Sequence, residues 1–116
     1  MNVSVKPFLA ALSLTLFLAL GTISSAWSAD LQRGRLAYGS WDHDTALRVF
    51  TTLSKQRNAE AQYSLAGMCE KGLGVTQDYA YALMWANSAA SIGDIKKWKI
   101  RAFVERIEKV MTSADI

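Results

Sequence analysis

Apolar side chains recur at spacings of three and four residues along most of the chain after residue 30. This spacing places them on one face of an α-helix. The clearest stretch lies within 95–111, where the apolar positions are Ile100, Phe103, Val104, Ile107, Val110 and Met111. No segment alternates with period two for long enough to predict a strand. The pattern therefore predicts an all-α protein.

The first two predicted helices precede residue 58. One has Leu31, Gly34 and Tyr38 on a single face and is broken at Gly39-Ser40. Asp42 is predicted to cap the second helix, with the preceding Trp41 packing on Ala46 as a hydrophobic staple. The predicted apolar stripe of this helix is Ala46, Val49, Phe50 and Leu53, with Leu47 at its border.

A third helix is predicted over 59–71 and a fourth from Asp78, its predicted cap, to about residue 91. Gly72 and Gly74 lie between them, and glycine accepts the left-handed geometry of a helix C-terminus. The predicted stripe of the third helix is Ala61, Leu65, Met68 and Cys69. That of the fourth is Tyr79, Ala82, Leu83, Ala86, Ala89 and Ala90, whose alanines allow a neighbouring helix to come close. Gly93 should end the fourth helix, and Asp94 should cap the fifth.

A set of spaced residues across 59–94 carries a family resemblance. The set is Ala61, Leu65, Gly72, Gly74, Val75, Asp78, Ala82, Trp85, Ala89, Ala90 and Gly93. This stretch resembles a Sel-one-like repeat (SLR), a variant of the tetratricopeptide repeat with a longer loop between its two helices. The sequence departs from the family's pattern at Ala66, where glycine is usual, and at Cys69, where an aromatic residue is usual.

The resemblance implies a short tetratricopeptide-like α/α stack of about five helices over residues 30–116. We expect a degenerate repeat at 31–58, the full repeat at 59–94 and a C-terminal capping helix at 95–111. Thr112, with Asp115 three positions later, has the spacing of a new helix start. Either the tail is frayed, or relatives continue into a helix that this chain lacks, which would leave the apolar stripe of the fifth helix partly uncovered.

Residues 1–29 have a different character. Lys6 is followed by an apolar run at 8–20 and then by small polar residues, the three parts of a secretory signal peptide. The run is shorter than the roughly 20 apolar residues that a membrane-spanning helix needs. We expect cleavage among residues 26–29, at the bond after Ser28 or Ala29, beside a helix expected to begin at Asp30. The alternative is an uncleaved anchor over 8–23.

Charge and cysteine content change this picture little. The chain carries 13 basic and 10 acidic residues, a net charge of +3, which does not argue for nucleic-acid binding. A lone cysteine excludes an internal disulfide, and Cys69 is expected to be a small buried residue. A basic excess on the fifth helix is expected to be a solvated face, and the alternative is docking to an acidic partner or an anionic membrane. Its members are Lys96, Lys97, Lys99, Arg101, Arg106 and Lys109.

Candidate chemistry is sparse. His43 lies between two aspartates, but zinc needs three or four converging ligands and the chain has a single histidine. Gly72 and Gly74 lack the following Lys-Ser or Lys-Thr of a phosphate-binding loop, and no strand precedes them. One histidine without a flanking motif gives no support for a Ser-His-Asp triad. We therefore expect no catalytic residues, no cofactor and no metal.

The leading hypothesis is an exported, periplasmic or secreted adaptor of a Gram-negative-type envelope that binds a protein or peptide. Repeat stacks bind through extended surfaces. Four residues fall outside or at the edge of the predicted stripes, and they are Tyr63, Tyr81, Met84 and Trp98. They are expected to pack between repeats, and the alternative is that they form such a contact surface. One alternative is a periplasmic hydrolase acting on cell-wall or β-lactam material, although the relatives to which this activity is attributed are rich in disulfides. Another is a membrane-tethered structural protein.

Overall fold

A computed structural model describes residues 26–114. The chain divides into two compact units, Met1–Asp30 and Leu31–Ile116. Residues 26–30 of the first unit are helical, so the helix expected to begin at Asp30 has already begun before it. No glycine or proline lies within residues 26–33 to interrupt the helix, so the helix extends back beyond Asp30. The predicted signal segment at 1–25 lies outside the described residues.

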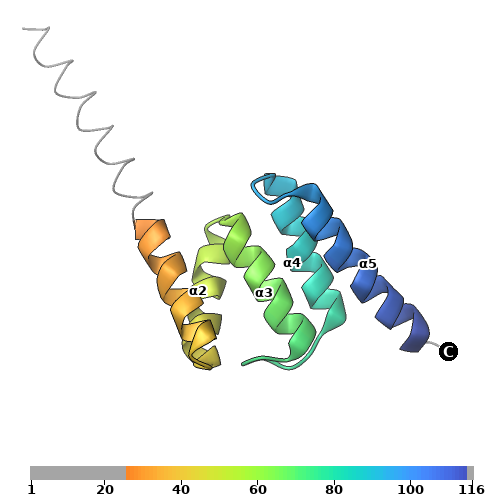
Figure 1. Cartoon of the computed structure of the whole chain (residues 1–116), viewed down its shortest axis with the longest axis horizontal. Helices are drawn as coiled ribbons and strands as arrows, with labels where there is room; N and C mark the ends of the chain where they lie inside the picture. Colours follow the sequence, from red (N-terminus) through yellow and green to blue (C-terminus); the bar gives the residue numbers. More distant parts are fainter. Residues whose placement is uncertain (1–25, 115–116) are drawn as a thin grey trace, which may run out of the picture. The chain divides into compact units, whose positions relative to one another are not determined.

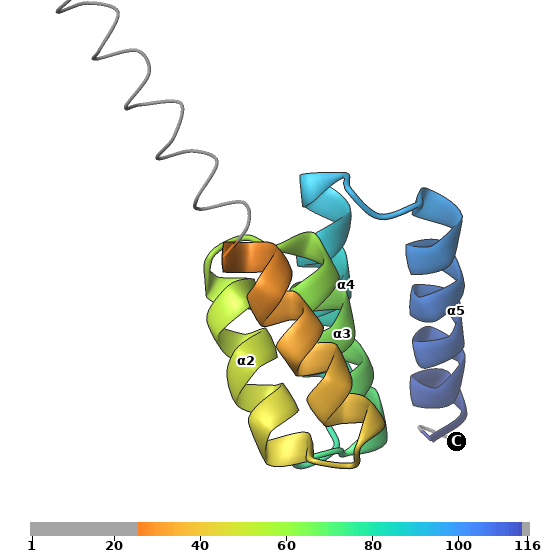
Figure 2. The same ribbon diagram turned by 60° about the vertical axis from the view of Figure 1, so that its left-hand side comes forward.

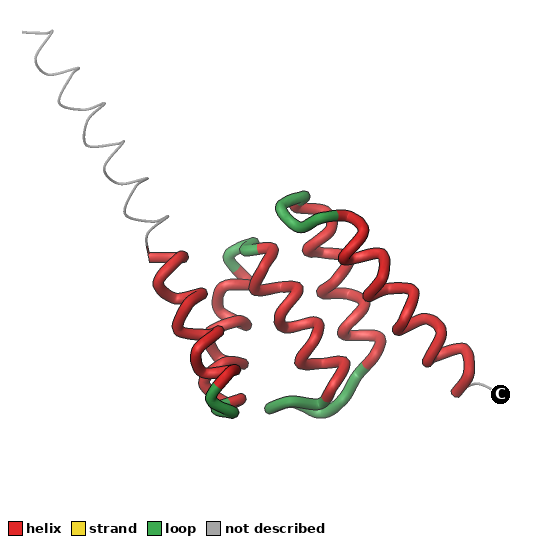
Figure 3. The backbone as a smooth tube through the Cα atoms, in the orientation of Figure 1, coloured by secondary structure: helices red, strands yellow, loops and turns green. Residues whose placement is uncertain are grey.

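The second unit is built from helices joined by turns and loops, of which the connection between α3 and α4 is an extended loop (Figures 1 and 3). Residues 31–39 complete the first helix. The others are α2 (His43–Lys55), α3 (Ala59–Lys71), α4 (Tyr79–Ile92) and α5 (Lys97–Ala114). No strand occurs between residues 26 and 114. The all-α, helical-repeat fold predicted from the sequence is confirmed.

The helices of this unit stack in chain order. α3 packs against α2 on one side and α4 on the other, and α5 packs against α4. Residues 31–39 run beside α2 (Figures 1 and 2). No helix in the described part of the chain combines the length and the apolar character needed to cross a membrane.

Small side chains allow α3 and α4 to approach closely. Ala61 and Ala66 of α3 and Ala82, Ala86 and Ala89 of α4 have no exposed surface. Larger apolar residues complete the core, and those buried in the other helices are Val49, Phe50 and Leu53 of α2 and Ile100, Phe103 and Ile107 of α5. The predicted stripes therefore form most of the core.

Side-chain caps begin three of the helices. Asp42, Asn58 and Asp78 each accept a hydrogen bond from the backbone amide three residues later, at 3.2, 2.9 and 2.9 Å. Such a bond satisfies one of the amides that lack a partner in the first turn of a helix. The caps predicted at Asp42 and Asp78 are confirmed.

The glycines at 72 and 74 fix the loop between α3 and α4. Gly72 ends α3 in a left-handed conformation, with φ of 69°, and Gly74 has φ of 73°. A Cβ atom on Gly74 would lie 3.1 Å from the carbonyl oxygen of His43, so the loop packs on the first turn of α2. The amide of Asp78 donates to the carbonyl of Cys69 at 2.9 Å and returns the chain to α3.

The hydrophobic staple predicted for Trp41 is wrong. Trp41 is 80% exposed and has φ of 63°. Its amide donates to the carbonyl of Tyr38 at 3.2 Å. The indole therefore remains largely in solvent, and its one aromatic contact among the described residues is with the ring of His43, edge-on at 5.7 Å.

The last helix begins two residues later and ends three residues later than the predicted range of 95–111. α5 begins at Lys97, so Lys96 precedes its first residue and Asp94 is not in the capping position. Thr112 does not open a new helix, because α5 continues to Ala114. The Thr112 hydroxyl donates to the carbonyl of Glu108 at 2.7 Å, an arrangement found inside helices.

Some predicted core positions are only partly buried. Ala90 is exposed, and Tyr79 and Leu83 of the same helix are half-buried. Val110 of α5 is also exposed, and so is Tyr38, which lines a groove.

Candidate functional site

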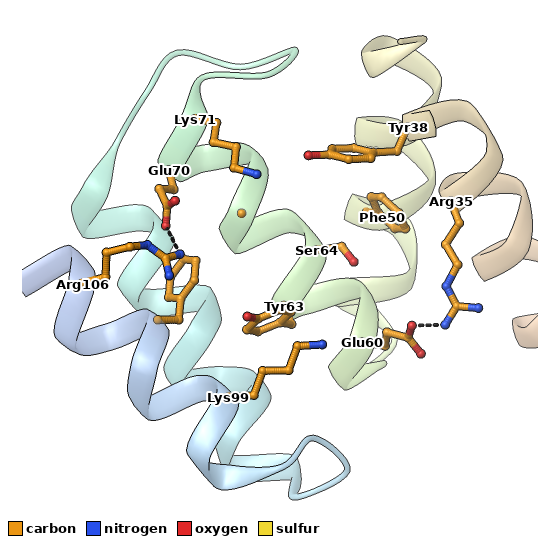
Figure 4. Close-up of a pocket in the computed structure, with 12 residues that line it drawn as sticks. Arg35, Tyr38, Phe50, Glu60, Tyr63, Ser64, Glu70, Lys71, Lys99 and Arg106 are labelled. Carbon is orange, nitrogen blue, oxygen red and sulfur yellow. Dashed lines mark hydrogen bonds and ion pairs between the residues drawn. The ribbon is translucent and has the colours of Figure 1, made fainter. Parts of the chain in front are cut away.

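One groove brings together residues from four helices of the second unit, and we call it the α3 groove (Figure 4). Its volume is about 340 Å³. The helix at 31–39 and Phe50 of α2 form one wall, and α5 forms the other. Residues of α3 along the groove are Glu60, Tyr63, Ser64, Gly67, Glu70 and Lys71, and those of the walls are Arg35, Tyr38, Phe50, Lys99, Phe103 and Arg106.

Aromatic rings and two glycines shape the inner surface of the groove. The Tyr63 and Phe103 rings lie 5.7 Å apart and tilted, and Phe50 is almost fully buried. Gly34 allows the wall helix to approach Phe50, since a Cβ at Gly34 would lie 2.7 Å from the Phe50 ring. A Cβ at Gly67 would meet no heavy atom within 4 Å. Gly67 therefore leaves an open depression halfway along α3.

Two ion pairs join α3 to the walls. Arg35 pairs with Glu60, and Arg106 pairs with Glu70 at 2.7 Å. Glu60 lies in the first turn of α3 and Glu70 in its last, so the pairs hold opposite ends of the groove. Exposed pairs of this kind stabilise by about 0–1 kcal/mol, and their main effect is to fix the positions of four charged side chains.

Two lysines of the groove remain without an ion-pair partner among the described residues. They are Lys71 and Lys99, which extend into the groove near its two ends (Figure 4). The Lys99 ammonium lies 5.0 Å from the centre of the Tyr63 ring, a cation–π distance. Four basic and two acidic side chains line the groove, a net charge of +2.

The residues that carry the repeat resemblance lie mostly in the core and the turns. Ala61, Leu65, Ala82 and Ala89 are buried, and Val75 and Trp85 are half-buried. Gly72, Gly74 and Gly93 have positive φ, and Asp78 caps α4. Ala90 is exposed. None of these residues lines the α3 groove, and their observed contacts position the helices.

The four residues predicted as a partner surface are divided among α3, α4 and α5. Only Tyr63 lines the α3 groove. Tyr81 and Met84 are exposed on α4, where Tyr81 meets Trp85 edge-on at 6.1 Å. Trp98 is exposed near the start of α5.

Sequence reasoning missed most of the groove, although one signal was present. Along α3, Glu60, Ser64, Gly67 and Lys71 recur at intervals of three and four residues. They form a second stripe beside the buried one. The wall residues gave no comparable signal, because Arg35 and Arg106 reach α3 from distant parts of the chain.

Cys69 and His43 have structural surroundings. Burial raises the pKa of the Cys69 thiol, and the nearby Asp78 carboxylate raises it further, which disfavours the reactive thiolate. His43 packs between the rings of Tyr38 and Trp41, at 5.8 and 5.7 Å. Residues 26–114 contain no group of three or more side chains that could hold a metal ion.

Comparison with known proteins gives one match. Residues 59–94, which comprise α3, the glycine loop and α4, match the Sel1 repeat family. Neither the curated proteins nor the solved structures contain a match to the chain. Sel1 repeats generally mediate protein–protein interaction. The helix–loop–helix at the centre of this protein is therefore a Sel1 repeat, set within a short stack of helices.

Proposed function

We propose that this protein is an exported adaptor without catalytic activity, and that it binds a segment of a partner protein in the α3 groove. The observation that carries the proposal is the groove itself. It combines aromatic surface, an open depression at Gly67 and charged side chains on the first helix of a Sel1 repeat. Protein interfaces combine apolar anchors and polar rims in this way.

Placement in the cell envelope is the second part of the proposal. It is supported by the charged start, apolar run and small-residue exit of residues 1–29. N-terminal sequencing of the protein recovered from cells tests it. A first residue within 27–30 supports export with cleavage, and an intact Met1 on membrane-bound protein contradicts it in favour of an anchor.

Photocrosslinking in intact cells tests the groove. Benzoylphenylalanine can replace Tyr38, an exposed tyrosine of the groove, or Tyr81, an exposed tyrosine of α4 outside it. The two replacements are matched in chemistry and exposure. We expect discrete adducts from position 38 and few from position 81. Adducts from position 81 alone would move the binding surface to α4.

The absence of catalysis can be tested directly. The purified protein should leave peptidoglycan and a chromogenic β-lactam unchanged. Hydrolysis by the protein that is lost on His43→Ala would contradict the adaptor proposal and favour a hydrolase.

A further inference from the structure

We propose that the α3 groove takes an extended acidic segment in which two carboxylates four residues apart meet Lys71 and Lys99. An apolar side chain midway between the carboxylates would occupy the depression at Gly67. This inference rests on the proposed binding function and names the chemistry of the partner.

The charge of the groove favours an acidic occupant. Glu60 and Glu70 are each paired with an arginine, so they do not neutralise the lysines. Lys71 and Lys99 are exposed and extend into the groove (Figure 4). Partner carboxylates at these two points would complete the charge pairing, whereas a basic segment would meet unpaired positive charge at both ends.

The positions of the lysines set the spacing of the carboxylates. Lys99 lies against the Tyr63 ring, and Lys71 lies eight residues after Tyr63 on α3. Eight residues span roughly 12 Å of helix at 1.5 Å per residue. An extended chain rises about 3.3 Å per residue, so four residues span roughly 13 Å.

The same geometry places the apolar side chain. Alternate side chains of an extended segment share one face, so the first, third and fifth positions would all face α3. Gly67 lies midway between Tyr63 and Lys71, and its depression lies in the groove lined by Phe50. The middle side chain would therefore lie over Gly67, in the open space of the groove.

A binding assay with a synthetic peptide tests the proposal. The probe is a fluorescein-labelled twelve-residue peptide with a central Glu-Ser-Leu-Ser-Glu in a glycine-serine background. Fluorescence anisotropy is measured with protein purified from cells that express the full chain, at about 50 mM salt to limit screening. Comparison peptides carry glutamine for both glutamates, serine for the leucine, or the two glutamates side by side.

The protein variants are chosen to separate the groove from general charge. Lys71→Gln and Lys99→Gln should each raise the dissociation constant about threefold, and together about tenfold, the range of exposed charge pairs. Lys97→Gln is the matched control, because Lys97 is an exposed lysine of α5 outside the groove and should change little. Gly67→Leu should abolish the preference for the leucine peptide, and circular dichroism checks that each variant is folded.

The result expected is binding of the spaced peptide that weakens with each change in the glutamates, the leucine or the two groove lysines. Equal binding of all four peptides, or equal loss with Lys97→Gln, would overturn the proposal. So would binding to phosphatidylglycerol vesicles that depends on Lys71 and Lys99 and that the peptide does not displace. Failure here with persistent crosslinks from position 38 would refute the acidic partner alone and leave the adaptor function standing.

Discussion

Gly34 and Gly67 both lie inside helices, in contrasting surroundings. A side chain at Gly34 would press on the buried ring of Phe50, whereas one at Gly67 would enter open space. The stack therefore needs the first glycine for packing. Gly67 costs helix stability, and the depression that it leaves in the α3 groove belongs to the proposed binding site.

Gly34→Ala and Gly67→Ala should change stability in opposite directions. Overpacking at Phe50 costs about 1–3 kcal/mol, which exceeds the gain of about 1 kcal/mol in helix propensity, so Gly34→Ala should lower the free energy of unfolding. Gly67→Ala should raise it by about 0.5–1 kcal/mol. Urea unfolding followed by circular dichroism measures both, and shifts of the same sign would contradict the packing described here.

Buried polar side chains of α2 and α3 differ in whether they are hydrogen-bonded. The side chains of Ser54 and Gln62 are buried, and the Ser54 hydroxyl has no hydrogen-bond partner. Gln62 donates to the Ser54 backbone carbonyl at 3.0 Å. Ser54→Ala should therefore raise the free energy of unfolding by about 1 kcal/mol, and Gln62→Ala should lower it by about 1–3 kcal/mol. Thermal unfolding distinguishes the two, and a loss of stability in Ser54→Ala would show that its hydroxyl is bonded.

At the scale of the helices, the caps and turns set where each element begins. Hydrogen bonds from the side chain and then the backbone amide of Thr45 lower the pKa of the Asp42 carboxyl below 3.8. A group with a lowered folded pKa contributes stability above its unfolded pKa, and that contribution is lost as pH falls through the folded value.

Titration by NMR should give Asp42 a pKa below 3.8, and Thr45→Val should move it back toward 3.8. The contribution of Asp42 to stability should be present at neutral pH and should fade only below pH 3.8. In Asp42→Asn this part of the acid dependence should disappear. A pKa for Asp42 above 3.8 would mean that the cap is not formed in solution.

Local sequence signals predicted α3 and α4 well. Asp78, Gly72 and Gly93 act within one turn of the positions they control, and such signals can be read without tertiary structure. The predictions of a staple at Trp41 and of a helix start at Thr112 were wrong, because the role of each residue depends on how the chain turns or continues around it. No glycine or proline ends α5 before Thr112, so the capping-box spacing at Thr112 does not begin a new helix.

At the scale of the whole molecule, the α3 groove depends on segments far apart in the sequence. Arg35 and Glu60 are 25 residues apart, and Glu70 and Arg106 are 36 apart. The sequence predicted the helices that carry these residues and the position of their buried faces. It could not predict which exposed residues would face one another, since that depends on how the helices are rotated and spaced in the stack.

The central claim is that a partner occupies the α3 groove. The most direct test fills the groove with a side chain at position 67 and detects the partner by crosslinking from position 38. Benzoylphenylalanine at position 38 should give an adduct in cells with the native glycine at position 67 and with Gly67→Ala. Gly67→Leu should fill the depression and remove the adduct while the circular dichroism spectrum stays helical. An adduct of undiminished yield in the folded Gly67→Leu protein would contradict the account.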